Sequence, residues 1–405
     1  MSQPPHQGPL VGMRVLDMTH VMAGPTCGMM LADMGADVIK IEKIDGGDDS
    51  RRMVPPLVNG EPASFMMMNR NKRGLVLDLK KDKGKEALLR LVKTADVLIE
   101  NYRKGTMERL GLGYERLKQE NPGLIYCEIS GFGRTGPLAD QGGFDLVAQG
   151  MTGLMSITGE GPGRPPVKVG APLTDITAGL LAAMGVSAAY AHKLRTGHGQ
   201  RVDTSLFEAG IVHTYWQSAI CLATGVSPEP QGSAHPLSAP YQAFQTSDGW
   251  ITLGASNQRS WERFIVAAGV PELGKDGRFA DNHARMENLA ALVEALTPVF
   301  LARSSGEWLA LLEEAGVPAG PVLDIKQMLA HPQTAAREMA PAFDHPVAGR
   351  TQALGFPVKF SATPGKVRHA APVFGQHTRE VLAEIGYTDA EIEAMLADGV
   401  ASEPR

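Results

Sequence analysis

The chain has 405 residues, of which 43% are hydrophobic and 20% are charged, and its formal net charge at pH 7 is -5. These values are typical of a globular protein with a sizeable core, and the negative net charge argues against a general nucleic-acid-binding surface. The N-terminal heptapeptide lacks the features of a signal or transit peptide, and no apolar run reaches the roughly 18 residues that span a membrane.

The first third of the chain alternates between short apolar segments and helical patterns. Strands are predicted at Met13–Met18, Asp37–Glu42, Leu75–Leu79, Asp96–Glu100 and Leu124–Ile129, with helices at Gly24–Met34, 82–93 and 114–120. This alternation is typical of a doubly wound α/β domain, in which a parallel sheet binds ligands at the carboxyl ends of its strands. We therefore expect a Rossmann-like large domain.

The remainder of the chain changes character at about residue 225. A long helix rich in Ala, Gly and Leu is predicted from Asp175 to Lys193, followed by a strand at Arg201–Thr204 and a helix at 205–223. A Pro-, Gly- and Ser-rich stretch comes next, followed by a hairpin with strands at Tyr241–Gln245 and Trp250–Gly254 and by several helices. These patterns predict a large domain over 1–225, a small α+β domain over 226–322, and a return to the large domain over 323–405.

Asp175 is the most informative residue of the sequence. It lies where the Pro-containing segment 169–174 meets the long apolar helix, close to backbone N–H groups that have no partner inside the helix. A carboxylate there can simply cap the helix. It can also attack a carbonyl group, with the free N–H groups receiving the developing oxyanion.

Other polar residues suggest a ligand but do not define one. The basic tract Asn69–Arg73 precedes a predicted strand, and Arg103, Lys104 and Arg109 follow another, so both are candidates for binding phosphate and also for solvated loops. The first strand is not followed by G-x-G-x-x-G, which disfavours an NAD enzyme. The cysteines Cys27, Cys127 and Cys221 have neither disulfide nor metal spacing, so we expect free thiols, a cytoplasmic protein and no metal site.

Several ordered motifs together resemble the family III CoA-transferases, which include formyl-CoA transferase and carnitine CoA-transferase. The resemblance extends from about Gly12 to Gly399, and the matching segments are 16–25, 35–43, 69–73, 97–102, 131–137 and 197–203. It implies an interlocked homodimer that uses acyl-CoA and small carboxylic acids as substrates, with no tightly bound cofactor. In this family the nucleophile is an aspartate, and the matching position is Asp175.

The resemblance also implies binding residues. The positions that match CoA contacts are His20, Val21, Ala23, Lys43, Leu77, Lys80, Asn101, Tyr102, Arg103 and Arg109. The positions expected to contact the acyl group or the acceptor acid are Met22, Phe144, Asp145, Gly254 and Ala255. The loop that begins at Gly254 is a candidate lid that excludes water. Similarity to dicarboxylate enzymes suggests succinyl-CoA as donor, with Arg134 or Arg259 holding a distal carboxylate.

Two alternatives stay open. The α-methylacyl-CoA racemases resemble this chain but carry a histidine in a Gly-His-Asp segment, where this sequence has Gly143-Phe144-Asp145. Phenylalanine cannot carry a proton, which disfavours proton transfer next to a thioester. A CoA-binding protein without catalytic activity is the second alternative, and the presence of Asp175 disfavours it.

Overall fold

The computed structural model describes residues 8–404, which divide into two compact units. The first unit comprises residues up to Thr152, Val169–His213 and Pro332 onward, and the second comprises Gly153–Lys168 and Thr214–His331. The second unit therefore begins earlier and ends later than the predicted range 226–322, and it includes a segment that the sequence analysis assigned to the large domain.

The first unit is built on a seven-stranded sheet in the order β14-β5-β2-β1-β6-β7-β8. Its strands are β1 (Arg14–Asp17), β2 (Asp37–Glu42), β5 (Lys72–Leu77), β6 (Val97–Glu100), β7 (Ile125–Ser130), β8 (Arg201–Ser205) and β14 (Ala401–Ser402). Six strands are parallel, which confirms the predicted α/β class, whereas β14 pairs antiparallel with β5. Strand β14 was not predicted, because a two-residue strand has no periodicity to detect.

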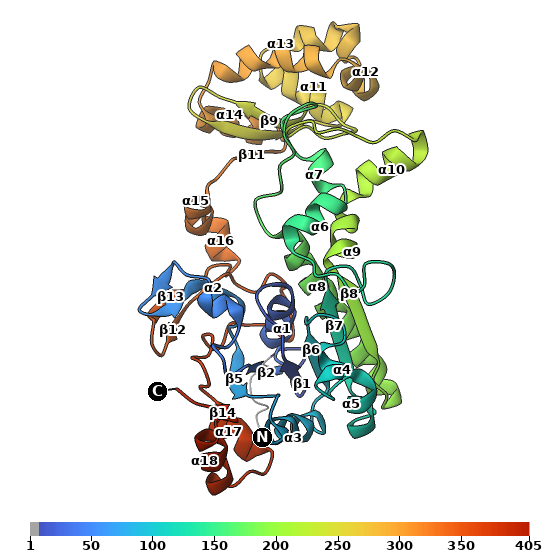
Figure 1. The fold of residues 1–405 in the computed structure, drawn as a ribbon. Helices are drawn as coiled ribbons and strands as arrows, with labels where there is room; N and C mark the ends of the chain where they lie inside the picture. The colour runs from blue at the N-terminus through green and yellow to red at the C-terminus, as the bar shows by residue number, and fades with distance from the viewer. Residues whose placement is uncertain (1–7, 405) are drawn as a thin grey trace. The chain divides into compact units, whose positions relative to one another are not determined.

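Helices cover both faces of this sheet (Figure 1). One face packs against α1 (Ala23–Asp33), α6 (Asp145–Met151), α8 (Leu173–Thr196) and α9 (Leu206–Ile211). The other packs against α3 (Asp82–Val92), α4 (Thr106–Arg109), α5 (Tyr114–Glu120), α17 (Thr378–Glu384) and α18 (Asp389–Ala397). Alternate strand residues serve the two faces, since Val97 and Ile99 join the first core and Leu98 joins the second.

Apart from a single-turn 3-10 helix at Asp49–Arg52, the remaining elements of the first unit are short α-helices and strands. They are β3 (Leu57–Val58), β4 (Glu61–Pro62), α2 (Ala63–Met68), α16 (Pro332–Ala336), β12 (Ala342–His345) and β13 (Gly349–Gln352).

The second unit is an antiparallel sheet with helices. Its elements are α7 (Leu154–Ile157), α10 (Tyr215–Thr224), β9 (Tyr241–Gln245), β10 (Trp250–Gly254), α11 (Gln258–Ala267), α12 (Asn282–Glu287), α13 (Leu289–Leu301), α14 (Ser305–Glu314), β11 (Ala319–Pro321) and α15 (Ile325–Ala330). The sheet order is β11-β10-β9, and the predicted hairpin has the observed bounds. Phe300 joins the sheet to the helices, because its ring stacks on Phe244 at 4.3 Å and lies 4.8 Å from Trp308.

Helix α8 has a mean hydropathy of 1.3 and is long and apolar enough to span a membrane, which the sequence analysis did not expect. It packs on α1, β7 and β8 inside the first unit, so its apolar side is that of a core helix. Its small residues let it approach α1 closely. A methyl group on Gly179 would lie 2.5 Å from the carbonyl oxygen of Ala23 and 2.7 Å from Cβ of Thr26.

This contact predicts the effect of one added methyl group. Gly179→Ala should lower the free energy of unfolding by about 1–3 kcal/mol, because two helix backbones would have to separate. Gly306→Ala is the matched control, since nothing lies within 4 Å of the added Cβ on Gly306 of α14, and helix propensity favours alanine. Urea unfolding followed by circular dichroism measures both effects, and equal stability of the two variants would contradict the prediction.

Candidate active site

A cavity of about 430 Å³ opens at the carboxyl ends of β1, β6 and β7. Of the residues expected to contact CoA, to contact the acyl group or to act as nucleophile, the structure brings nine together in its wall, namely His20, Val21, Met22, Ala23, Asn101, Tyr102, Arg103, Phe144 and Asp175. Residues from loops and a helix start thus converge on one cavity, although they are separated by up to 155 positions, from His20 to Asp175. Ligands of open parallel sheets occupy this edge.

The loop after β1 is held in an unusual conformation by neighbouring side chains. The amide of Asn101 accepts from His20 N–H at 2.8 Å and donates to the His20 carbonyl at 2.9 Å. Asp48 accepts from Val21 N–H at 3.0 Å. Val21 has a φ of 64°, a region that costs a β-branched residue of the order of 1–3 kcal/mol. The surrounding hydrogen bonds therefore hold this strained loop at the cavity wall.

A buried network of ion pairs supports the loop after β1. Lys40 Nζ lies 2.8 Å from Asp48, and Lys72 Nζ lies 2.7 Å from Asp17, with all four side chains fully buried. Burial alone would raise the pKa of Asp48, but Lys40 and two backbone N–H groups hold it well below its ordinary value. The carboxylate that binds Val21 is therefore ionised at any physiological pH.

Two glycines bring the loops beside Asp175 into direct contact. A Cβ on Gly131 would lie 2.5 Å from Cα of Gly143, and one on Gly143 would lie 2.4 Å from Cα of Gly131. No side chain fits between these backbones, so the loop after β7 and the segment leading to Phe144 must meet main chain to main chain. Both glycines line the cavity.

Asp175 is the third residue of α8, and its side chain is partly buried at the cavity wall. Burial, with a contribution from the nearby charge of Asp145, raises the pKa of Asp175 to about 6. An aspartate that is fully exposed to water has a pKa of about 3.9. The difference arises because the folded chain removes water from the carboxylate, to an extent that the sequence does not show.

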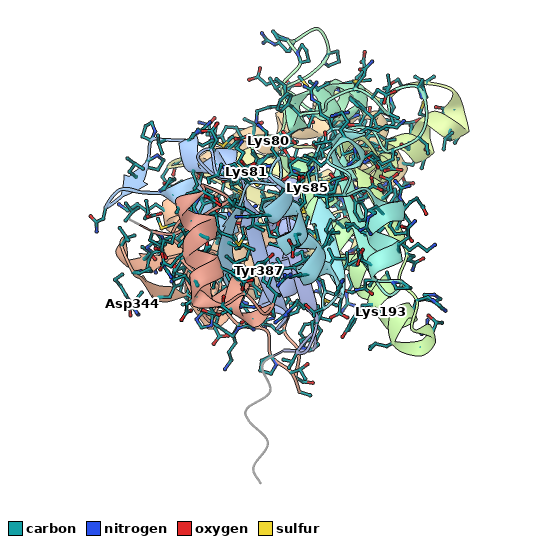
Figure 2. The ribbon with its side chains drawn as sticks, turned by 60° about the horizontal axis from the view of Figure 1, so that its bottom comes forward. Lys80, Lys81, Lys85, Lys193, Asp344 and Tyr387 are labelled. Carbon is teal, nitrogen blue, oxygen red and sulfur yellow. The ribbon has the colours of Figure 1, made fainter. Side chains whose placement is uncertain are left out.

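Four of the residues expected to contact CoA lie outside the cavity wall, at or after strand ends on the same edge. Lys43 follows β2 and pairs with Asp49 at 2.6 Å, while Leu77 ends β5 and is buried. Arg109 ends α4 and donates to Thr106 at 2.9 Å. Lys80 follows β5, and Figure 2 shows it near Lys81 and Lys85, far from Lys193. Lys193 marks the amino edge because it pairs with Asp96, which precedes β6.

Of the residues expected to contact the acyl group or the acceptor acid, only two line the cavity. Met22 and Phe144 line the cavity, and Phe144 is 75% exposed. The carboxylate of Asp145 is occupied by Thr174 and Gln149 and does not line the cavity. Gly254 and Ala255 belong to the second unit, so their role stays a prediction.

Arg134 is not available to hold a substrate carboxylate. Its guanidinium lies 2.7 Å from Glu100 and 3.0 Å from Glu128, and it donates to the Tyr102 carbonyl at 3.0 Å. The arginine is 8% exposed, so these partners use its donors inside the protein. The expectation that Arg134 holds a distal carboxylate is therefore not supported, and Arg259 belongs to the second unit.

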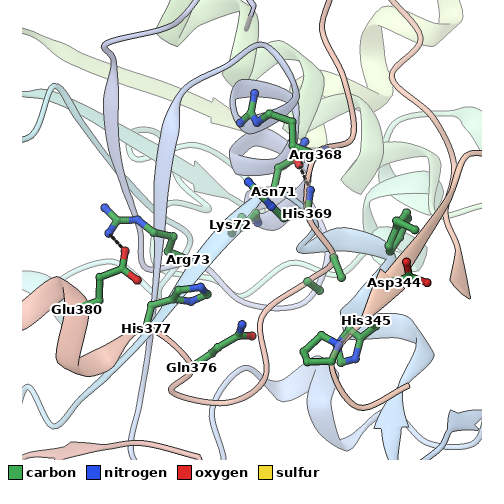
Figure 3. A pocket seen from close by; sticks show the side chains of 14 residues that line it. Asn71, Lys72, Arg73, Asp344, His345, Arg368, His369, Gln376, His377 and Glu380 are labelled. Carbon is green, nitrogen blue, oxygen red and sulfur yellow. Dashed lines mark hydrogen bonds and ion pairs between the residues drawn. The ribbon is translucent and has the colours of Figure 1, made fainter. Parts of the chain in front are cut away.

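The basic tract Asn69–Arg73 is likewise structural. It leads into β5 at the amino edge, beside a separate cavity of about 700 Å³ (Figure 3). Arg70 forms a buried pair with Asp33 at 2.6 Å, and Arg73 binds Asp37 and Glu380, each at 2.7 Å. Its charges are neutralised by carboxylates from distant segments. This arrangement argues against the phosphate interpretation of the tract.

The fold and the cavity define an α/β enzyme with a partly buried carboxylate at the carboxyl edge of a parallel sheet. The sequence profile described as CoA-transferase family III matches residues 10–378, and the chain belongs to this family. The protein described as succinate–glutarate CoA-transferase from Agrobacterium fabrum is 38% identical, over 94% of this chain and 97% of its own.

Two further proteins resemble the chain. The acetyl-CoA:oxalate CoA-transferase of Acetobacter aceti is 40% identical over 82% of this chain and 85% of its own. The crystal structure of a CAIB/BAIF family protein from Brucella suis superposes with a TM-score of 0.83 at 39% identity, covering 94% of this chain and all of the other. The predicted family and CoA-transferase activity are therefore confirmed.

The raised pKa of Asp175 predicts that its charge costs stability. The folded protein disfavours the ionised form, so the cost is present above about pH 6 and disappears below the unfolded value of about 4. Asp175→Asn should therefore stabilise the protein at pH 8 by roughly 1–2 kcal/mol, and by much less at pH 4.5. Thermal unfolding at both pH values measures this, and an equal effect at both would contradict it.

Proposed function

We propose that the chain transfers CoA from succinyl-CoA to a dicarboxylic acid, with Asp175 as the nucleophile. The observation that carries the proposal is a carboxylate at the start of α8, partly buried in the cavity where nine predicted site residues meet. With a pKa of about 6, this carboxylate is mostly ionised at neutral pH and more basic than an ordinary aspartate. It is therefore both charged and nucleophilic under physiological conditions.

The reaction proceeds through acylated forms of Asp175. A carboxylate oxygen attacks the thioester carbonyl, the C–S bond breaks, and CoA thiolate leaves a mixed anhydride. The thiolate attacks the aspartyl carbonyl, which forms an aspartyl-CoA thioester and releases succinate. The acceptor carboxylate attacks this thioester and expels the thiolate, giving a second anhydride. The thiolate then attacks the acceptor acyl carbonyl, which yields the new acyl-CoA and restores Asp175.

One backbone donor at the start of α8 can support these steps. In the first turn of α8, the N–H groups of Leu173 and Ile176 donate to carbonyls of the chain, and Thr174 N–H donates to Asp145. Among the described residues, the N–H of Asp175 has no acceptor. It can receive the oxyanion that develops as the carbonyl is attacked.

The CoA portion is proposed to lie along the carboxyl edge. Arg103 lines the cavity, has no ion-pair partner among residues 8–404, and suits a phosphate. Lys80 and Arg109 extend positive charge beyond the cavity along the same edge, and Lys43, which pairs with Asp49, is proposed as a further CoA contact there. His20, Val21, Ala23, Leu77, Asn101 and Tyr102 complete the proposed CoA contacts, and Gly254 and Ala255 are proposed to act on the acyl side. The three free cysteines fit a reducing, cytoplasmic setting.

Asp175→Ala should abolish transfer. Mixed with succinyl-CoA and glutarate in deuterated water, the native protein should form glutaryl-CoA without deuterium at the carbon next to the thioester. The variant should form less than about one-thousandth as much, because the nucleophile is gone. Asp140→Asn removes an exposed carboxylate as a control. Chromatography with mass spectrometry measures the products.

The alternatives give different products. Deuterium incorporation without CoA transfer would establish the racemase-like reaction, and binding of CoA without either reaction would establish a binding protein. Oxalate in place of glutarate as the better acceptor would overturn the proposed acceptor while leaving the transfer mechanism intact.

The proposed homodimer rests on exposed apolar side chains. On α6, Leu146 and Met151 are 54% and 49% exposed, and on α8, Met184 and Leu194 are 64% and 70% exposed. Large apolar side chains exposed on two helices that pack together are typical of a protein interface. We propose that a second copy of the chain covers them in an interlocked dimer.

Met184→Glu should weaken this dimer. A charge would be buried without a partner in the proposed interface, which should raise the dissociation constant by at least about tenfold. Val11→Glu changes another exposed apolar side chain, away from α6 and α8, and is the control. Sedimentation velocity over a range of concentrations measures the effect, and a native protein that is monomeric throughout would contradict the proposed dimer.

A further inference from the structure

Two side chains on α6 hold the segment that leads into the nucleophile helix. Asp145 and Gln149 lie one helical turn apart and therefore project from the same side of α6. Both hydrogen-bond to residues between 169 and 174, immediately before Asp175. Helix α6 was not predicted from the sequence, and Gln149 was missed with it. The resemblance to the family implied that Asp145 contacts substrate.

Asp145 caps the start of α8 from a neighbouring helix, because the residue at the N-cap position of α8 cannot do so. The N-cap position of α8 is Pro172, which makes no side-chain capping bond. Asp145 Oδ1 instead accepts from the N–H of Thr174 at 3.0 Å and from its hydroxyl at 2.8 Å. Thr174 is fully buried and directly precedes Asp175. Two bonds to one residue fix the backbone from which the nucleophile projects.

Gln149, which hydrogen-bonds to Asp145 on α6, requires a carboxylate at that position. The side-chain oxygen of Gln149 accepts from Val169 N–H at 2.9 Å, which fixes the orientation of its amide. The amide nitrogen must then face Asp145, and it donates to Oδ2 at 2.8 Å. Gln149 is fully buried, so neither bond can be exchanged for water. Asparagine at position 145 has one oxygen and one NH₂ group, so its NH₂ would face either the NH₂ of Gln149 or the N–H of Thr174, and a donor would meet a donor.

The charge of Asp145 has a second consequence. Burial is the main cause of the raised pKa of Asp175, and the negative charge of Asp145 raises it further, because two carboxylates near one helix start repel each other. The charge on Asp175 disappears when its oxygen becomes part of an anhydride. The repulsion is therefore present in the free enzyme and relieved as acylation proceeds, which favours the transition state over the ground state.

We propose that Asp145 is the positioning residue for Asp175: it holds the start of α8 through Thr174 and Gln149, and its charge keeps the nucleophile reactive. This inference rests on the proposed role of Asp175. It replaces the expectation that Asp145 contacts substrate.

Asp145→Asn tests the proposal through three separate readouts. The kcat for transfer from succinyl-CoA to glutarate should fall by roughly 10- to 100-fold, because the carboxylate of Asp175 is no longer held in position. The KM for succinyl-CoA should stay within about twofold, since no CoA contact changes. The acid limb of kcat/KM, which reports the free enzyme, should move to lower pH.

The shift of the acid limb can be measured as the ratio of kcat/KM at two pH values, which does not depend on the absolute rate. If the limb moves down by about one pH unit, kcat/KM at pH 5 relative to pH 8 should rise roughly fivefold over the native ratio. Ionisation of the substrates affects both proteins equally and cancels in this comparison. A merely structural role for Asp145 would not change the ratio.

Two further variants separate position from charge. Thr174→Val removes the hydroxyl bond and keeps the charge of Asp145, so it should lower kcat and leave the acid limb in place. Asp140→Asn removes a charge from an exposed residue and should change neither. If Asp145→Asn does not fold by circular dichroism, Thr174→Val and Asp145→Glu carry the test, and native kcat in both would overturn the proposal.

Other outcomes are equally decisive. Native kcat with an unchanged limb in Asp145→Asn would overturn the proposal. A raised KM with native kcat would assign Asp145 to substrate binding. If the native protein transfers no CoA, or Asp175→Ala is fully active, the proposed function itself fails, whereas an inactive Asp175→Ala beside a native-like Asp145→Asn sinks only this inference.

Discussion

The buried ion network of Lys40, Lys72, Asp17 and Asp48 is the constraint on which the rest of the first unit depends. It joins three neighbouring strands to the start of α1 and the loop after β1, and it lies in a region from which water is excluded. Removing one member of such a network leaves an unpaired buried charge, which typically costs 3–5 kcal/mol. Because Asp48 also binds Val21 N–H, the same charges that hold the sheet together hold the cavity wall in its strained conformation.

The cavity is then shaped by backbone contacts that exclude side chains. Gly131 against Gly143 brings two loops together, and Gly179 against α1 brings two helices together. Close packing of this kind places the start of α8 in a partly dehydrated position, where a carboxylate becomes more basic without losing its charge at neutral pH. The reactivity that we assign to Asp175 is thus a consequence of packing around it, and no unusual residue type is needed.

Much of the architecture could be predicted from local patterns. The strand Asp37–Glu42 and the hairpin of β9 and β10 have the predicted bounds, because strong apolar or turn signals define their ends. The helix predicted at 205–223 is divided between α9 and α10, and α6 was not predicted at all. Helix α6 has only seven residues, one of them a glycine, and so short a segment carries too little periodicity to be distinguished from a loop. It nevertheless carries Asp145 and Gln149.

By itself the sequence determined the α/β class, the family, and the placement of an aspartate at a helix start, because each depends on residues close together in the chain or on ordered motifs. Only the tertiary structure decided which charges are free to act. Asp145 meets Thr174 across 29 positions, Arg70 meets Asp33 across 37, and Arg134 meets Glu100 across 34. A charged side chain has the same appearance in a sequence whether it faces a ligand or a buried partner, and folding alone determines which of the two it meets.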